Sequence, residues 1–431
     1  MATQQLTSDP AVEATRALLQ RLTASYTPRD FAVRFWDGST WEPDPGQPAN
    51  FTLVLQHPGA LRQMFAKGSA MSLGEAYIYD DFDVEGDMRG FVTLQLHLRD
   101  QKRSLGELLS LGLALRRLPS TARPRVGRQA AKLQGKRRSL ERDREAISYH
   151  YDLSNEFFSL WLDRNMVYTG AYFSSRDEDL DTAQERKLDY VCRKLQLRPG
   201  ERFLDLGCGW GGLVLHAAQH YGVKAAGITL ARRQAEWAQE RIRAAGLEGR
   251  CRVEYRDWRE MDEPEGYDKL ASICMLEHVG EALMPAFFQN ASRLLRPGGL
   301  HLNQGITIST HTIVPKGTNF PESYVFPDGE LKPVNVTLRA AEGAGFEIRD
   351  VECMREHYDL TLQHWLQRLE AHREELIRLT DEVTYRIFRI YLARAGQGYR
   401  VRDFNLYQTL LAKTVPGEHV QPLTRSGWYT A

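Results

Sequence analysis

The pattern of hydrophobic and polar positions changes at about residue 145. From there on, short apolar runs that end in glycine or polar residues alternate with amphipathic helical stretches, which predicts a parallel α/β sheet. A long helical insertion is expected over about 358–398, before the last strand. The seven predicted strands lie in ERFLDLGCG, VKAAGITL, CRVEYRDW, YDKLASICMLEHVG, GGLHLNQGITI, FEIRDVECM and FNLYQTLLAK.

The chain before residue 105 has a mixed pattern. A helix is expected over 11–24, then short alternating strands in FAVRFWDG and NFTLVLQHP, and a helical patch over 60–65. The segment GEAYIYDDFDVEGD follows, in which aromatic residues interleave with acids. Residues 105–118 are apolar and helix-prone. We therefore predict a smaller mixed α/β N-terminal domain (1–118), a linker (119–144) and an α/β domain (145–431).

Composition indicates a globular protein with a core, since 42% of the 431 residues are apolar and 26% are charged. Lys plus Arg equals Asp plus Glu at 56 each, so no global field favours a nucleic-acid partner. No apolar run reaches the length of about 18 residues that a membrane-spanning helix needs, and no secretory signal is visible. Five scattered cysteines without a CxxC pair argue against disulfides and a metal site, and fit a reducing cytoplasm.

The balanced net charge hides one basic segment. Residues 116–144 contain eleven Lys or Arg and only two acids. Two interpretations remain open. The segment is either a solvated linker, or a patch for the anionic phospholipid headgroups of a membrane surface.

A glycine-rich turn, GCGWGG (207–212), follows a predicted strand and precedes a predicted helix. Glycines there let the backbone approach a ligand closely, and the helix start favours electron-rich groups. A ligand-free turn and an NAD site are the alternatives. An NAD site needs a carboxylate at the end of the next strand, where this chain has Thr229 and Leu230. Asp205 completes LDLGCG, a pattern seen widely in S-adenosylmethionine (SAM) methyltransferases, so we expect SAM.

Six segments that occur in order carry a more specific resemblance, to the cyclopropane fatty acid synthase family. They are YHYDLSNEFFSLWLDRNMVYTGAYF, FLDLGCGWGG, GITLARRQAEWA, MLEHVG, YVFPDGEL and YLARAGQGYRVRDFNLYQ, and together they cover about residues 145–415. The segment GEAYIYDDFDVEGD extends the likeness to the N-terminal domain of the long bacterial members. The resemblance implies an α/β fold of the class I SAM-methyltransferase type, with a Rossmann-like seven-stranded sheet, helical insertions and an antiparallel final strand.

The resemblance also implies a SAM site, residue by residue. Its members are expected beside the methionine part, under it in the glycine turn, at the ribose and at the adenine. In that order they are Tyr168 and Thr169; Gly207, Cys208 and Gly209; Thr229, Leu230 and Gln234; and Asp257 and Trp258. Asp205, two residues before the turn, is also expected to bind SAM. Gln234 replaces the acid usual in the family, and an ordinary core aromatic is the alternative for Trp258.

The family adds the methyl carbon of SAM to the double bond of an unsaturated acyl chain, usually in a phospholipid. An alkene is a poor nucleophile, so the reactants must be aligned in a site that excludes water. Attack leaves a carbocation, which aromatic faces and a carboxylate can stabilise. A base must then remove a proton from the bridging methyl to close a cyclopropane ring. By resemblance, Glu277 and Tyr391 belong to the catalytic site.

The sequence departs from the family at two ligands of the bicarbonate ion that is thought to act as the base. The family Cys is Gly170 here, and the family His is Gln304, which can donate a hydrogen bond to an anion but carries no charge. Tight bicarbonate binding is therefore not expected. Three outcomes stay open: ring closure with Glu277 or loosely held bicarbonate as base, a methyl- or methylene-branched product, or a different substrate.

The function we expect is SAM-dependent C-methylation of unsaturated phospholipid acyl chains. The N-terminal domain would associate with lipid and residues 116–144 would contact an anionic membrane surface, which predicts a cytoplasmic protein bound peripherally to the inner face of the membrane. A homodimer rests on family likeness alone. Two alternatives remain: a methyltransferase of a small soluble substrate, since plant alkaloid N-methyltransferases share the catalytic domain, and a non-catalytic SAM- or lipid-binding paralogue.

Overall fold

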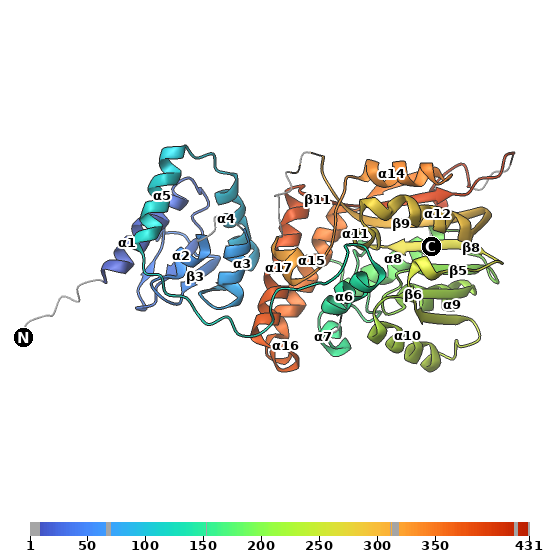
Figure 1. The fold of residues 1–431 in the computed structure, drawn as a ribbon, viewed down its shortest axis with the longest axis horizontal. Coiled ribbons are helices and arrows are strands. Elements are labelled where there is room, and N and C mark those ends of the chain that lie inside the picture. The colour runs from blue at the N-terminus through green and yellow to red at the C-terminus, as the bar shows by residue number, and fades with distance from the viewer. Residues whose placement is uncertain are drawn as a thin grey trace, which may run out of the picture. The chain divides into compact units, whose positions relative to one another are not determined.

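The computed structural model describes residues 9–65, 70–151, 153–310, 312, 319–417 and 421–429, and the chain groups into two compact units (Figure 1). The first unit consists of residues 1–129, 317–320 and 380–397, and the second of residues 130–316, 321–379 and 398–431. No described helix is long and apolar enough to cross a membrane.

The first unit has a four-stranded sheet with strand order β2-β1-β3-β4. β1 and β3 are parallel, while β1–β2 and β3–β4 are antiparallel. Alternation sets the buried face, since Phe51, Leu53 and Leu55 on β3 are buried and the residues between them are half-buried. The elements are α1 (Pro10–Thr23), β1 (Phe31–Arg34), β2 (Thr40–Trp41), β3 (Phe51–Leu55), α2 (Ala60–Phe65), α3 (Ala70–Ile78), β4 (Phe82–Gly86), α4 (Met88–Asp100) and α5 (Leu105–Arg117).

The predicted helical insertion is present as three helices: α15 (Arg355–Ala371), α16 (Arg373–Leu379) and α17 (Glu382–Arg400). Residues 380–397, which include most of α17, belong to the first unit. Arg386 donates to the carbonyls of Tyr77 and Phe82, and Arg389 donates to the carbonyls of Val84 and Gly86 at 2.8 and 3.2 Å. These contacts satisfy the carbonyls of alternate residues along β4, an edge strand that would otherwise expose them.

The second unit has a seven-stranded sheet with strand order β10-β11-β9-β8-β5-β6-β7. All seven predicted strands are present, and β11 is antiparallel to both of its neighbours. This confirms the predicted α/β fold and its reversed final strand. The strands are β5 (Arg202–Leu206), β6 (Lys224–Thr229), β7 (Cys251–Tyr255), β8 (Tyr267–Ile273), β9 (Leu295–Ile308), β10 (Glu347–Cys353) and β11 (Phe404–Ala412).

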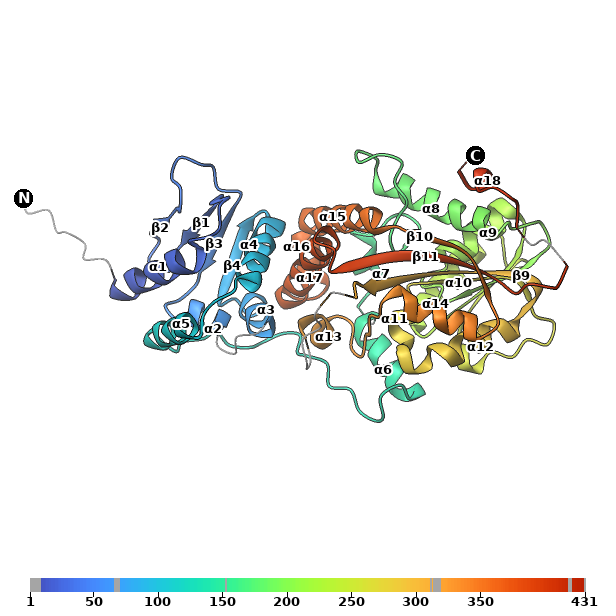
Figure 2. The same ribbon diagram turned by 90° about the horizontal axis from the view of Figure 1, so that it is seen from above.

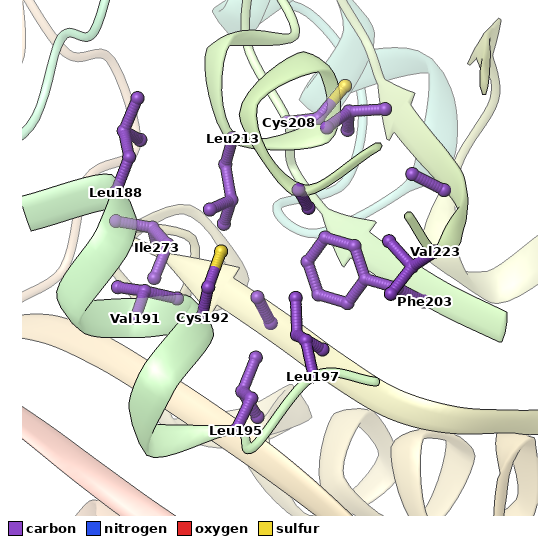
Figure 3. Close-up of a cluster of buried hydrophobic side chains, with 14 of the residues drawn as sticks. Leu188, Val191, Cys192, Leu195, Leu197, Phe203, Cys208, Leu213, Val223 and Ile273 are labelled. Carbon is purple, nitrogen blue, oxygen red and sulfur yellow. The ribbon is translucent and has the colours of Figure 1, made fainter. Parts of the chain in front are cut away.

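Helices cover both faces of this sheet, with α8 and α9 on one side and α12 and α14 on the other (Figure 2). Leucine, valine and cysteine side chains from α8, α9 and the strands form one apolar cluster around Phe203 (Figure 3). A second cluster on the opposite face includes Trp258, Phe287 and Phe288. The helices and 3₁₀ turns are α6 (Leu140–Tyr151), α7 (Asn155–Ser159), α8 (Leu180–Lys194), α9 (Gly212–Tyr221), α10 (Arg232–Ala244), η1 (Trp258–Glu260), α11 (Leu276–Val279), η2 (Glu281–Leu283), α12 (Met284–Leu294), α13 (Phe320–Tyr324), α14 (Val334–Gly343) and α18 (Ser426–Tyr429).

We predict that Arg389→Met destabilises the first unit by about 1–3 kcal/mol, because it leaves the carbonyl of the buried residue Val84 without its side-chain donor. Denaturant unfolding followed by circular dichroism measures the loss. Arg400→Met, at the exposed end of the same helix, is the control and should leave the transition unchanged. Equal midpoints for the two variants would contradict this role of α17.

Candidate active site

The glycine turn joins β5 to α9 through backbone conformations that side chains disfavour. Gly207, Gly209 and Gly211 have φ values of +88°, +54° and +80°. The N–H groups of Gly207 and Cys208 donate to the Ile228 carbonyl at 3.0 and 2.9 Å, which ties the turn to β6. A Cβ on Gly209 would meet no atom within 4 Å, so the turn has an open side there. A ligand can therefore approach this backbone closely.

The ends of the next two strands place polar groups beside the turn. The Thr229 hydroxyl accepts from the Ala231 N–H at 3.2 Å and donates to Gln234 Oε1 at 2.8 Å, which leaves the Gln234 amide nitrogen as its remaining donor. The Leu230 side chain is half-buried. After β7, both carboxylate oxygens of the fully buried Asp257 accept from the Arg259 guanidinium at 2.7 Å.

Trp258, predicted to contact adenine, lies within the second apolar cluster. Its side chain is 6% exposed, and its ring makes an edge contact with Phe287 at a centroid distance of 5.3 Å. The Arg259 guanidinium lies 5.5 Å from the Trp258 ring centroid. The indole thus packs in the core, and adenine contact remains a prediction.

A buried polar cluster contacts Thr169, which is predicted to lie beside the methionine part of SAM. Lys187 on α8 donates to Thr169 Oγ1 at 3.0 Å, and Gln184 donates to the Thr169 carbonyl at 2.7 Å. Burial lowers the pKa of Lys187 to about 8 and raises that of Asp205 to about 7. Asp205 Oδ1 has no hydrogen-bond partner in the described structure. Lys187 and Gln184 are therefore placed to fix the position of Thr169.

Sequence reasoning missed Lys187 and Gln184, although a signal was present. Both residues fall on the apolar stripe of α8, among buried Ala183, Leu188 and Val191 at helical spacing. A lysine and a glutamine on such a stripe need buried partners, and the chain supplies these in the segment that carries Thr169.

Tyr168 lies at the centre of an aromatic cluster. Its ring centroid is 5.2 Å from those of Trp161 and Trp365, and it stacks on His150 at 5.6 Å. Phe158 and Phe326 complete the cluster at 5.8 and 6.3 Å. The predicted methionine-contact residue is thus held among faces that exclude water and can stabilise a cation.

Glu277 lies in the first turn of α11, shortly after the end of β8, and is buried. Its Oε1 accepts from the Ile306 N–H at 2.6 Å, while its Oε2 has no hydrogen-bond partner in the described part of the chain. Burial raises the pKa of Glu277 to about 7. Glu277 is also one of the residues around a pocket beside α11, β9 and β11, with Asn303, Tyr407 and Thr409 among the others. It is therefore placed to exchange a proton near neutral pH.

Gln304 is fully buried on β9 and faces the segment that carries Glu277. Its side-chain oxygen accepts from Gln408 at 2.9 Å, and its amide nitrogen lies 3.9 Å from Cys274 Sγ. Gln408 in turn accepts from buried Lys194 at 3.0 Å. The structure thus brings Gln304 close to the Glu277 segment, with its donor side directed there.

Gly170 and Tyr391 differ in where the structure places them. A Cβ on Gly170 would lie 2.8 Å from Leu406 Cδ2 and 3.3 Å from Tyr358 Cγ, so packing now fills the space of the family cysteine side chain. Tyr391 is half-buried on α17, within the residues that group with the first unit, whereas Glu277 and Gln304 belong to the second. A catalytic role for Tyr391 remains a prediction.

The basic segment contributes a clamp on α11 that no sequence pattern indicated. Arg138 donates to the His278 carbonyl at 2.8 Å and to Glu330 at 3.1 Å, and the Glu330 N–H donates to the Glu277 carbonyl at 2.9 Å. A Cβ added at Gly280, the residue directly after α11, would overlap the Arg138 guanidinium, so glycine leaves room for this side chain. Arg138 therefore positions the short helix that carries the catalytic candidate.

The chain is similar to known proteins over most of its length. A family model described as mycolic acid cyclopropane synthetase matches residues 138–409, and a model of a domain of unknown function matches residues 18–103. A probable fatty acid methyltransferase of Pseudomonas putida is 36% identical over 403 residues, which cover 92% of this chain and 95% of that protein. The chain belongs to the cyclopropane synthase family.

A further relative and a solved structure are similar to this cyclopropane synthase family member. The cyclopropane-fatty-acyl-phospholipid synthase of Escherichia coli (strain K12) is 35% identical over 295 residues, covering 67% of this chain and 72% of that protein. The structure of mycolic acid cyclopropane synthase CmaA1, complexed with SAH and CTAB, is 31% identical with a TM-score of 0.60 and covers 63% of this chain and 98% of that one. The protein is an enzyme that uses SAM as co-substrate and methylates lipid.

The residues of the second unit fit SAM. The open side of the turn at Gly209 leaves room for a ligand against the backbone. Asp205 Oδ1, which is buried without a hydrogen-bond partner in the described ranges, calls for a donor. We expect Gly207, Gly209 and Asp205 to hold the methionine part together with Thr169, and the Gln234 amide to donate to the ribose. These assignments follow the family match and remain predictions.

We predict that Gly170→Cys destabilises the second unit by about 1–3 kcal/mol, because its side chain would overlap the buried Leu406 methyl group. Leu406→Val should be less costly in the Gly170→Cys background than in the unaltered chain, which thermal unfolding of the four proteins in a double-mutant cycle measures. Gly343→Cys, where a new Cβ meets open space, is the control. Additive effects of the two substitutions would show that Leu406 does not restrict position 170.

Proposed function

We propose that the enzyme transfers the methyl carbon of SAM to the double bond of an unsaturated acyl chain carried by a phospholipid. The observation that carries this proposal is Glu277, a buried carboxyl group with one oxygen that has no hydrogen-bond partner among the described residues, in the same unit as the aromatic cluster around Tyr168. Methylation of a soluble amine needs no apolar surroundings for a carbocation. The lipid-modifying relatives support the same substrate class.

Each group has a distinct task in this reaction. SAM, when bound, supplies an electrophilic methyl group. The rings around Tyr168 exclude water from the reacting carbons and stabilise the positive charge that develops on the acyl chain. Glu277 accepts the proton that the methylated chain must lose, and the Ile306 N–H holds its other oxygen in place.

The surroundings of Glu277 favour this carboxylate over bicarbonate as the base. Gln304 offers only neutral N–H donors there, since Gln408 occupies its oxygen, and Leu406 and Tyr358 fill the space beside Gly170. Two side chains that would hold bicarbonate in the family are therefore replaced, one by a neutral amide and the other by glycine. The product, whether a cyclopropane or a methyl or methylene branch, is then set by which proton Glu277 reaches.

Peripheral membrane association from the cytoplasmic side is part of the proposal. Much of the positive charge of the basic segment, however, is paired with carboxylates of the same chain. At least six of its eleven cations have carboxylate partners within 4.0 Å. The pairs are Arg123 with Asp80, Arg125 with Glu75, Arg137 with Glu322 and Asp328, Arg138 with Glu330, Arg142 with Asp328, and Arg144 with Glu260. Headgroup contact is therefore assigned to cations outside these pairs, among them the exposed Arg116 and Arg117 at the start of the segment.

The direct test of the proposed function is an assay with methyl-labelled SAM and vesicles of unsaturated phospholipid. We expect label in the acyl chains, each modified chain gaining one CH2 unit if a ring or methylene branch forms. Vesicles of saturated phospholipid are the control, and proton NMR of the released fatty acids distinguishes a cyclopropane from a branch. Unlabelled acyl chains, from protein that calorimetry shows to bind SAM, would refute the proposal.

We predict that Glu277→Gln lowers kcat by about a hundred- to ten-thousand-fold, because the amide cannot accept the proton. In the unaltered enzyme the pKa of about 7 keeps the carboxyl group increasingly protonated as the pH falls. Below pH 7 kcat/KM should therefore fall about tenfold per pH unit. Glu281→Gln, at an exposed carboxylate in the following turn, is the control. A pH profile of Glu277→Gln that matches that of the unaltered enzyme would exclude Glu277 as the base.

A further inference from the structure

α5 presents a row of leucines to solvent. Leu105, Leu108, Leu109 and Leu113 are 80%, 52%, 69% and 58% exposed, whereas the one fully buried residue within this helix is Leu111. Positions i, i+3, i+4 and i+8 share one side of a helix, so the four side chains form a continuous stripe. We call Leu105, Leu108, Leu109 and Leu113 the leucine face.

The exposure of the leucine face does not result from a frayed helix. Ser104 and Glu107 form a capping box, with the Ser104 N–H donating to Glu107 Oε2 at 2.7 Å, so the first turn is fixed. The opposite side of α5 packs against α1 and α2 within the first unit (Figure 1), with Leu111 and Leu118 buried there. The helix therefore has a second apolar side beyond the one that its own unit buries.

Charge around the leucine face is positive. Lys102 and Arg103 precede α5, and Arg116 and Arg117 form its last turn. Arg116 follows Leu113 by three residues and so lies on the leucine face itself, and Arg117 is exposed beside it. The one acid of the helix, Glu107, is engaged in the capping box.

We propose that α5 inserts the leucine face into the interfacial region of an anionic lipid bilayer, with Arg116 and Arg117 on the headgroups. This inference rests on the proposed function, since a bilayer carries the acyl substrate. The face consists of aliphatic side chains with cations at its end and offers no aromatic anchor or hydrogen-bonding group for a protein partner. Such a composition fits an in-plane membrane helix, in which apolar burial and attraction to anionic lipid act together.

Vesicle sedimentation with the full chain tests the proposal. The unaltered protein should bind phosphatidylcholine vesicles that contain phosphatidylglycerol. The fourfold variant Leu105→Gln, Leu108→Gln, Leu109→Gln and Leu113→Gln should partition about tenfold or more weakly, since glutamine keeps the helix but removes the apolar surface. Arg116→Gln with Arg117→Gln should weaken the preference for phosphatidylglycerol over pure phosphatidylcholine. Leu423→Gln, at a leucine that is fully exposed elsewhere, should change nothing.

An independent measurement reports insertion directly. The fluorescence of Trp in a Leu109→Trp variant should be quenched by brominated acyl chains beyond the quenching of the natural tryptophans, whereas Leu423→Trp should add no such quenching. Undiminished binding of the fourfold variant, or no added quenching in Leu109→Trp, would overturn the proposal. A dimer that becomes monomeric in the fourfold variant, with vesicle binding unchanged, would instead assign the leucine face to a second copy of the chain.

Failure of this inference can be separated from failure of the proposed function. With unsaturated phospholipid dispersed in detergent micelles, the fourfold variant should methylate at the unaltered rate, because the leucine face is remote in sequence from the catalytic residues. A protein that binds vesicles through α5 but transfers no label would refute the function and leave the membrane contact standing.

Discussion

The burial of one carboxyl group constrains the catalytic unit more than any other interaction. An ionised carboxylate is costly to remove from water unless hydrogen bonds compensate it. The Ile306 N–H donates to Glu277 Oε1, and within the described residues Oε2 has no hydrogen-bond partner. The resulting shift of the pKa toward neutrality holds only while α11 stays against β9. The Arg138 guanidinium and the Glu330 N–H donate to carbonyls of α11. Both residues therefore matter to the chemistry, although neither is placed to touch substrate.

The residues at the two replaced bicarbonate ligands fit their surroundings, Gln304 by hydrogen bonding and Gly170 by packing. Gln304 and Gln408 are paired residues on β9 and β11, and their amides hydrogen-bond across the strands. Gln408 also accepts from Lys194, whose ammonium group is paired with Asp350 and Glu352. A neutral amide at position 304 thus extends a satisfied polar network through the sheet. Packing around position 170 matches it, because Leu406 lies on the same strand as Gln408.

Much of the fold could be predicted because β5, β6, β8, β9 and β11 are largely buried runs bounded by glycine and polar residues, whereas β7 and β10, at the two edges of the sheet, are more exposed. The glycine turn could also be placed from the sequence, because its positive φ values favour glycine. The assignment of residues 380–397 to the first unit could not be predicted. It depends on guanidinium groups that meet backbone carbonyls about 300 positions away, and carbonyls leave no mark in a sequence. The pairing of the basic segment was hidden likewise, because its acidic partners lie far along the chain.

The contribution of α17 to the first unit has a consequence for biosynthesis. A ribosome releases the strands and helices of residues 10–117 long before it makes the two arginines that complete the edge of β4. Until then the nascent sheet has an open hydrogen-bonding edge, the kind of surface at which unfinished chains associate wrongly. The first unit therefore lacks the side-chain donors for this edge until α17 has been made, close to the end of the chain.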